Sequence, residues 1–232
     1  MLSTIKNLRN YLKWDPIFIS SCLIALVLAA ADGPSLAASA ESLSTDELRE
    51  LQVKLNQRQN LSVRFTQIRT SNLRPKKPST SSGRAVFAKP AKFRWEFEKP
   101  SADILLFDGR SLISFKPGEK TATRFNSQAE RAREIKEVID FVLDFDALLS
   151  RYSIKQAQKD RNEISLTLQP KSPGAIRELK INIDGKSYFV SAIKMTFQNR
   201  NISEFKFLDP TTGALPTDAF NVPSGVQVLD GV

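Results

Sequence analysis

Residues 83–108 include a run in which apolar and polar side chains alternate with a period of two. Within this stretch Phe93, Trp95 and Phe97 are separated by charged residues. Successive side chains of a β-strand point to opposite faces, so the three aromatic rings would line one face of a strand. A face this apolar needs a second layer, a lid or a ligand to cover it.

Short polar breaks divide the surrounding region into a series of strands. We expect strands at about 83–89, 92–98, 103–108 and 111–116, because Lys-Pro, Asp-Gly and Lys-Pro-Gly sequences separate them. The preceding residues, 74–82, are rich in proline, serine and lysine and show no apolar period, so they predict an exposed hairpin loop. The pattern is that of an antiparallel meander.

The same alternation occurs on both sides of this meander. Leu61, Val63 and Phe65 begin a strand near the amino-terminal end. In the last third of the chain four further apolar sets alternate with polar residues: Ile164, Leu166 and Leu168; Leu179, Ile181 and Ile183; Ile193, Met195 and Phe197; Phe205 and Phe207. Each strand offers one apolar face, so a long sheet of such strands must curl around a shared interior.

Two regions have helical periodicity instead. Ser44 and Glu47 have the spacing of a capping box, and leucines follow at helical spacing, which predicts a helix over about 45–58. Between the two sets of strands, residues 129–150 predict one broken helix or two short ones. Its apolar stripe consists of Ile135, Val138, Ile139, Val142 and Leu143.

These elements predict an α+β fold: a curled antiparallel sheet forming an incomplete β-barrel, closed by an amino-terminal helix and a central helical segment. The helices could fill the concave face as a packed core, or close it as a lid over a hydrophobic cavity. The pattern of apolar positions leaves both arrangements open.

The first 40 residues have the organisation of a secretory signal. Basic residues precede an apolar stretch at 17–31, and a small-x-small cleavage site ends at Ala40. We expect a signal peptide over 1–40 and a single domain over 41–232. An uncleaved membrane anchor is disfavoured because the apolar stretch is shorter than the ~20 residues of a spanning helix. A lipoprotein signal ending at Cys22 is disfavoured because most of the apolar stretch follows that cysteine.

Composition narrows the possible chemistry. The chain has 34 basic and 25 acidic residues, a formal net charge of +9, one cysteine and no histidine. The positive charges are spread along the predicted strands and helices without a recognition motif, so they predict a solvated basic surface and no nucleic-acid binding. The missing histidines exclude histidine-based triads and most transition-metal sites.

Carboxylates are the remaining candidates for catalysis. Asp140, Asp144 and Asp146 are close in sequence, as are Glu96 and Glu98. The aspartates fit the polar face of a helix and lack the pattern of a calcium-binding loop, and the glutamates fit the outer face of a strand. We therefore predict no catalytic residue, no cofactor and no metal site.

Several short motifs, in order and at matching spacing, resemble the LolA family of periplasmic carriers of outer-membrane lipoproteins. The resemblance covers about residues 46–229. The matching motifs are Phe65-Thr66-Gln67, Lys89-Pro90 followed by Phe93-Arg94-Trp95, Pro100, Ile104 through Asp108-Gly109, and Phe220-x-x-Pro223-x-Gly225-Val226.

The resemblance implies a monomeric periplasmic protein whose hydrophobic cavity takes the acyl chains of a lipoprotein. Such a carrier receives its cargo from an inner-membrane ABC transporter and delivers it to an outer-membrane acceptor. By this resemblance the cavity or its lid would be lined by Phe93, Trp95, Phe97, Ile135, Val138, Ile139, Val142 and Leu143.

The resemblance also implies a latch that holds the lid closed. In the family an arginine before the proline reaches backbone carbonyls of the lid, whereas this chain has Lys89 before Pro90. Lysine keeps the charge but replaces a planar five-donor group with a three-donor ammonium. Lys89 could serve as the latch, Arg94 or Lys92 could replace it, or Lys89 could be a solvated turn residue.

Two other functions are compatible with the sequence. The protein could bind another amphiphile, such as a glycolipid or a phospholipid, with the same cavity. It could also be a structural or sensory domain in which the sheet surrounds a packed core.

Overall fold

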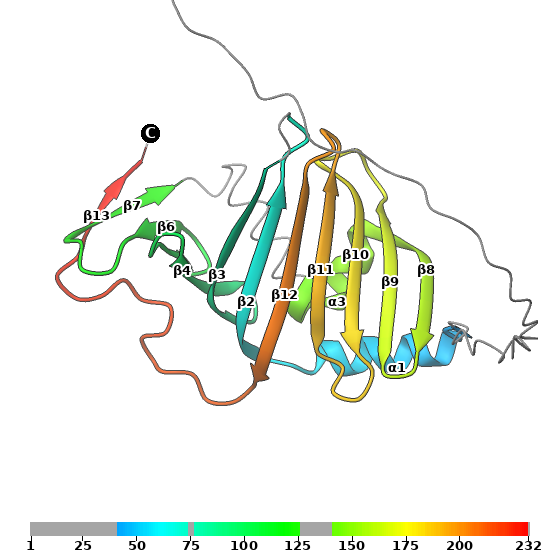
Figure 1. The fold of residues 1–232 in the computed structure, drawn as a ribbon. Helices are drawn as coiled ribbons and strands as arrows, with labels where there is room; N and C mark the ends of the chain where they lie inside the picture. Colours follow the sequence, from blue (N-terminus) through cyan, green and yellow to red (C-terminus); the bar gives the residue numbers. More distant parts are fainter. Residues whose placement is uncertain (1–40, 74–76, 126–140, 232) are drawn as a thin grey trace, which may run out of the picture. The chain divides into compact units, whose positions relative to one another are not determined.

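The structure is a computed structural model that describes residues 41–73, 77–125 and 141–231. Its main feature is one sheet of thirteen strands in the order β1-β8-β9-β10-β11-β12-β2-β3-β4-β5-β6-β7-β13. The sheet is curled and does not close, because β1 and β13 are its two edges (Figure 1). The expected signal peptide over 1–40 lies outside the described residues.

The strands and helices have the following bounds: β1 (Glu41–Ser42), α1 (Thr45–Asn56), β2 (Asn60–Thr70), β3 (Pro78–Ala88), β4 (Lys92–Lys99), β5 (Ile104–Phe107), β6 (Leu112–Phe115), β7 (Thr121–Phe125), α3 (Phe145–Arg151), β8 (Tyr152–Asp160), β9 (Glu163–Pro170), β10 (Ile176–Asp184), β11 (Val190–Phe197), β12 (Ile202–Thr211) and β13 (Gln227–Asp230).

Two antiparallel meanders make up nearly all of the sheet. Strands β2 to β7 form one meander and β8 to β12 form the other, and β12 joins them by pairing antiparallel with β2. In this pairing Phe207 lies opposite Phe65 and Phe205 lies opposite Gln67. The prediction of a curled, incomplete antiparallel barrel is confirmed, and β13, which runs parallel to β7, is an unpredicted exception.

Helix α1 begins at the predicted capping box. The hydroxyl of Ser44 accepts a hydrogen bond from the backbone N–H of Glu47 at 3.3 Å, and the Glu47 carboxylate accepts from the backbone N–H of Ser44 at 3.0 Å. Leu51 and Leu55 are its buried residues. The helix was predicted over 45–58 and ends only two residues earlier.

The predicted central helical segment is interrupted at Asp144, which agrees with the expectation of one broken helix or two short ones. Residues 141–143 are helical, and Asp144 then caps α3 by accepting a hydrogen bond from the backbone N–H of Ala147 at 2.9 Å. The earlier part of the segment, with Ile135, Val138 and Ile139, lies outside the described residues. No helix within the described ranges is both long and apolar enough to cross a membrane.

One expectation for the first meander was wrong. Residues 74–82 were expected to form a loop, but β3 begins at Pro78 and pairs with β2 as far as Thr70. The serines and threonine of this segment show no alternation of apolar and polar residues. A strand can still pair through its backbone without that alternation when one face meets solvent and the other meets a polar part of the interior. Strand β8 also escaped prediction because most of its residues are polar.

The helices pack against one part of the sheet interior. Leu51 and Leu55 of α1 join Phe145 and Leu148 of α3 and the inward side chains of the sheet in one hydrophobic core. In Figure 1, α3 lies behind the second meander and α1 runs along the lower ends of its strands. Between the helices and the second meander, the interior is therefore a packed core.

A second, smaller core lies on the opposite face of the first meander. It consists of Ile104, Leu106, Ile113, Phe115 and Ala122 from β5, β6 and β7. The carboxy-terminal segment covers it with Phe220, Val222, Val226 and Val228. This outer layer was not predicted from the sequence.

Candidate ligand-binding pocket

The three aromatic residues of β4 point to the inner face of the sheet, as their alternation predicts. Phe93 and Trp95 are 1% and 2% exposed, and Phe97 is half-buried. The Trp95 ring lies 5.0 Å from that of Phe65, 6.0 Å from that of Phe97 and 5.3 Å from that of Phe205, between ring centroids. Trp95 is therefore the centre of an aromatic cluster that both meanders build.

Only part of this aromatic row lines a pocket. Trp95 and Phe97 border a pocket of about 600 Å³, within the range of small-molecule sites. Phe93 is not among the lining residues and stacks on Phe107 instead, with ring centroids 5.8 Å apart. Val142 and Leu143 are each 1% exposed and belong to the packed core, so they do not line this pocket either.

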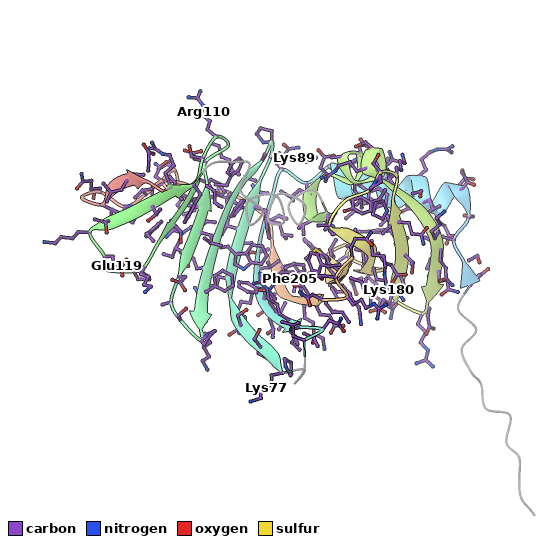
Figure 2. All side chains as sticks on the ribbon, turned by 90° about the horizontal axis from the view of Figure 1, so that it is seen from above. Lys77, Lys89, Arg110, Glu119, Lys180 and Phe205 are labelled. Atoms are coloured by element: carbon purple, nitrogen blue, oxygen red, sulfur yellow. The ribbon has the colours of Figure 1, made fainter. Side chains whose placement is uncertain are left out.

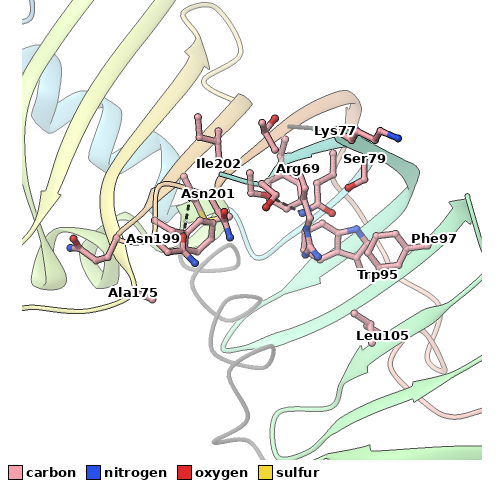
Figure 3. Close-up of a pocket in the computed structure, with 18 residues that line it drawn as sticks. Arg69, Lys77, Ser79, Trp95, Phe97, Leu105, Ala175, Asn199, Asn201 and Ile202 are labelled. Carbon is pink, nitrogen blue, oxygen red and sulfur yellow. Dashed lines mark hydrogen bonds between the residues drawn. The ribbon is translucent and has the colours of Figure 1, made fainter. Parts of the chain in front are cut away.

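The pocket lies between β2, β3 and β4 of the first meander and β11 and β12 of the second (Figure 3). Its apolar wall consists of Trp95, Phe97, Leu105, Met195, Phe197, Ile202 and Phe205. Figure 2 shows Phe205 pointing into the interior of the sheet. The remaining wall is polar and includes Gln67, Arg69, Lys77, Ser79, Asn201 and Ser203.

This division follows a change of polarity along the inner face of β2. Leu61, Val63 and Phe65 face inward at one end of the strand, and Gln67 and Arg69 continue the same face toward the other end. The neighbouring strands change in the same way: Ser81 and Ser79 of β3 lie opposite Gln67 and Arg69, and Ser203 of β12 lies opposite Arg69. Along β2, β3 and β12 the pocket is thus apolar at one end and polar at the other, whereas Met195 of β11, opposite Ser203, remains apolar.

A hydrogen-bonded network organises the polar side. Gln67 is 2% exposed and Ser203 is 4% exposed. In the amide orientation that satisfies every neighbour, the Gln67 oxygen accepts from Ser203 Oγ at 2.9 Å and from Arg69 Nε and Nη2 at 2.8 and 3.2 Å. The Gln67 amide nitrogen then donates to Ser81 Oγ at 3.3 Å. Gln67 therefore holds the Arg69 guanidinium at the pocket wall.

Two features give the polar side a surplus of hydrogen-bond donors. Arg69 and Lys77 are both cationic, and none of the 18 lining residues is Asp or Glu. In addition, the indole nitrogen of Trp95, Nε1, is buried and has no hydrogen-bond partner among the described residues. A buried donor without an acceptor is costly and calls for a structural or functional explanation.

Lys89 connects the sheet to both helices at the other end of β3. Its Nζ donates to the backbone carbonyl of Asn56, the last residue of α1, at 2.8 Å. The side-chain oxygen of Asn56 accepts from the backbone N–H of Phe145, the first residue of α3, at 2.9 Å. Lys89 is half-buried and bonded in this way, so it is not a solvated turn residue.

The other latch candidates lie on the outer face of the sheet. Arg94 forms an ion pair with Glu96 at 2.6 Å, and Lys92 lies over the ring of Phe220 at 6.0 Å. Of the carboxylates considered for catalysis, Glu98 pairs with Arg84 at 3.4 Å and Asp144 caps α3, whereas Asp140 lies outside the described residues. Within the described ranges no three acidic, cysteine or histidine side chains gather as a metal site would require.

The polar side of the pocket was not foreseen from the sequence. Gln67 and Arg69 continue the inward alternation of Leu61, Val63 and Phe65, and this continuation was the available signal. Ser79 and Ser81 were hidden by the incorrect expectation of a loop. The contact of Gln67 with Ser203 joins residues 136 positions apart, and no local pattern indicates it.

Comparisons with known proteins agree with the geometry. The family described as outer membrane lipoprotein carrier protein LolA matches residues 56–223. An outer-membrane lipoprotein carrier protein of Chromobacterium violaceum is 26% identical over 90% of this chain and 98% of its own length. One from Vibrio vulnificus is 30% identical over 81% of this chain and 94% of its own length.

Among solved structures, an uncharacterized conserved protein from Thermus thermophilus has a similar fold. The TM-score is 0.50 at 10% identity, and the match covers 79% of this chain and 99% of that chain. This likeness concerns the fold alone.

Proposed function

Because this chain belongs to the LolA family of outer-membrane lipoprotein carriers, we propose that it binds the acyl chains of lipoproteins in the interior of its sheet and delivers them to the outer membrane. The family is one of carriers, so the function is binding and transfer. The proposal places the protein in the periplasm as a monomer. It would receive cargo from an inner-membrane ABC transporter and pass it to an outer-membrane acceptor.

The observation that carries this proposal is the pocket bordered by Trp95, Phe97 and Phe205. It places an apolar wall within reach of a ligand, whereas Phe93, Val142 and Leu143 belong to the packed core. Covering one methylene group contributes about 0.8 kcal/mol, so one long acyl chain gains on the order of 10 kcal/mol before the costs of binding. An apolar wall of this kind supplies the affinity that a carrier of acyl chains needs.

The bonds of Lys89 support reversible binding. A carrier must also release its cargo, so its empty state has to be stabilised against the apolar gain of binding. Lys89 ties the sheet to α1, and Asn56 ties α1 to α3. We propose that these bonds stabilise the empty state and are exchanged for cargo contacts. Phe93, Val142 and Leu143 would contact cargo only if the core opens in this way.

The first experiment is the release of lipoproteins from spheroplasts. The full-length gene is expressed, the protein is purified from the periplasmic fraction, and it is incubated with spheroplasts that produce labelled lipoproteins. We expect a soluble complex of the protein with one acylated lipoprotein. Absence of the protein from the periplasm would contradict its proposed location.

A pair of variants on β4 tests the place of binding. Phe97→Glu puts a charge into the pocket wall, whereas Lys92→Glu puts the same side chain on the outer face of the same strand. We expect the first variant to lose lipoprotein release and the second to keep it. If the folded wild-type protein releases no lipoprotein but binds a phospholipid or a glycolipid, its cargo is another amphiphile and the lipoprotein proposal is wrong.

A further inference from the structure

We infer that Arg69, which Gln67 and Ser203 hold at the polar wall, binds the carbonyl oxygens that link the acyl chains of the ligand to its polar head. This inference rests on the proposed function, because it assigns an orientation to an acyl ligand in the same pocket. The head of the ligand lies at the polar side, beside Arg69. The chains extend over Trp95, Phe97 and Phe205.

The arrangement of Arg69 supports a binding role. An arginine side chain that no neighbour holds in place would lose much conformational entropy when it binds a ligand. Here Gln67 accepts from Nε and Nη2 of Arg69, and Gln67 itself is buried and bonded to Ser203 and Ser81. The guanidinium is therefore positioned before a ligand arrives, and its other N–H groups remain to donate.

The chemistry of the wall selects an acceptor. The carbonyl oxygens of esters and amides accept hydrogen bonds, and the wall offers the guanidinium of Arg69 and the ammonium of Lys77 as donors. No carboxylate lines the pocket to compete for these donors. A hydrocarbon without polar groups forms no hydrogen bonds with this wall, and it displaces the water that solvates the polar side chains. The pocket therefore suits a molecule that carries acceptor oxygens at one end of its acyl chains.

The unpartnered indole nitrogen points to the same ligand chemistry. Trp95 Nε1 is buried beside the pocket with no acceptor among the described residues. A small movement of the side chains at the wall would bring a ligand oxygen to it, and a buried donor that gains an acceptor recovers its desolvation cost. Trp95 would then contribute an apolar ring and one hydrogen-bond donor to the same ligand.

The inference is tested with two lipids that differ only in their carbonyl groups. Isothermal titration calorimetry measures the binding of 1,2-dioctanoylglycerol, which has two ester carbonyls, and of 1,2-dioctylglycerol, its ether analogue. Both are used below the concentrations at which they aggregate. Apolar transfer alone favours the ether, which lacks the polar carbonyls, whereas the polar wall favours the ester. We expect the ester to bind about tenfold more tightly.

Two arginines of β2 provide the variant and its control. Arg69→Met removes the guanidinium from the pocket, and Arg64→Met removes one from the outer face of the same strand, where Arg64 pairs with Asp209. We expect Arg69→Met to lose most of the preference for the ester and Arg64→Met to keep it. Trp95→Phe keeps an aromatic ring without the N–H, and it should weaken the ester preference without abolishing ether binding.

The outcomes separate this inference from the proposed function. Equal binding of ester and ether by the wild-type protein would overturn the inference and leave the acyl-binding function in place. Binding of neither lipid would contradict acyl binding itself. A third ligand, dioctanoyl phosphatidic acid, tests whether Arg69 binds a phosphate instead of a carbonyl. If Arg69→Met weakens the binding of this ligand alone, Arg69 binds an anionic head group and the carbonyl assignment is wrong.

Discussion

The side chain of Lys89 bonds a turn at the end of β3 to the last residue of helix α1. It donates to a carbonyl that α1 leaves without an intrahelical partner. A cation at this end of a helix also complements the helix dipole. One residue thus connects the sheet to the helices that fill its interior.

Replacing Lys89 tests whether this bond balances cargo binding. Lys89→Leu should keep or tighten lipoprotein binding, because the empty state loses a hydrogen bond, and it should slow the transfer of bound lipoprotein to acceptor membranes. The measurement is the rate of transfer from the purified complex. Lys89→Arg keeps a cationic donor and serves as the control. Normal transfer by the leucine variant would limit Lys89 to a structural role.

Gly83 is a second residue whose identity the structure requires. It lies on β3 opposite Phe65 and Phe97, where the backbone of β4 approaches closely. A methyl group at this position would overlap the backbone carbonyl group of Glu96. Only glycine lets β4 approach β3 while Phe97 turns toward the pocket.

Gly83→Ala should therefore lower the free energy of unfolding by about 2–3 kcal/mol, since relief of the overlap requires movement of a strand. Urea denaturation measures the change. Gly174→Ala is the matched control, because a methyl group there would meet nothing within 4 Å. Equal stability of the two variants would show that β4 moves freely.

At the scale of elements, α1 depends on an acidic residue in its first turn. Hydrogen bonds from the Ser44 backbone and hydroxyl groups, and then from Lys159, lower the pKa of the Glu47 carboxyl. The folded state therefore holds the ionised form of Glu47 more strongly than the unfolded state does. This contribution is fully present above the ordinary pKa of a glutamate and is lost as the pH falls through the lowered value.

Glu47→Gln tests this dependence while keeping a side chain that can complete the capping box. We expect the variant to be less stable than the wild-type protein at neutral pH. The difference should shrink as the pH falls below the ordinary pKa of a glutamate. Urea denaturation across this range provides the measurement, and a difference that stays constant with pH would contradict the assignment to the charge of Glu47.

The elements also show which features local sequence can predict. Helix α1 was predicted within two residues because its capping box and leucine spacing are local signals. The inward aromatic row of β4 was predicted for the same reason. The start of β3 was missed because Ser79 and Ser81 interrupt the apolar period. The polar wall was missed because it depends on the register of β2 with β12, which brings distant residues together.

At the scale of the whole molecule, the sheet carries apolar clusters on both faces. The inner cluster packs against α1 and α3, and the outer cluster on β5, β6 and β7 is covered by the carboxy-terminal segment. Phe220 packs against this outer cluster. An uncovered cluster of this kind would expose apolar side chains to water and favour aggregation.

Phe220→Ser should lower the free energy of unfolding by on the order of 2 kcal/mol, the usual scale for exposing a large apolar contact. Leu208→Ser is the control, because Leu208 is already 51% exposed. It should change stability by less than about 0.5 kcal/mol. Urea denaturation compares the free energies of unfolding of the two variants. An unchanged value for Phe220→Ser would mean that the carboxy-terminal segment contributes little to stability.

The pocket lies across the junction of β2 with β12, and this position has a consequence for the order of folding. Each meander can form from contacts between neighbouring strands, whereas the junction pairs residues more than 130 positions apart, which makes it the slow step. Both meanders contribute residues to the apolar wall and to the polar wall, so neither alone forms the pocket. Cargo can therefore be held only by a chain that has finished folding, and once bound it should lower the rate at which the two meanders separate.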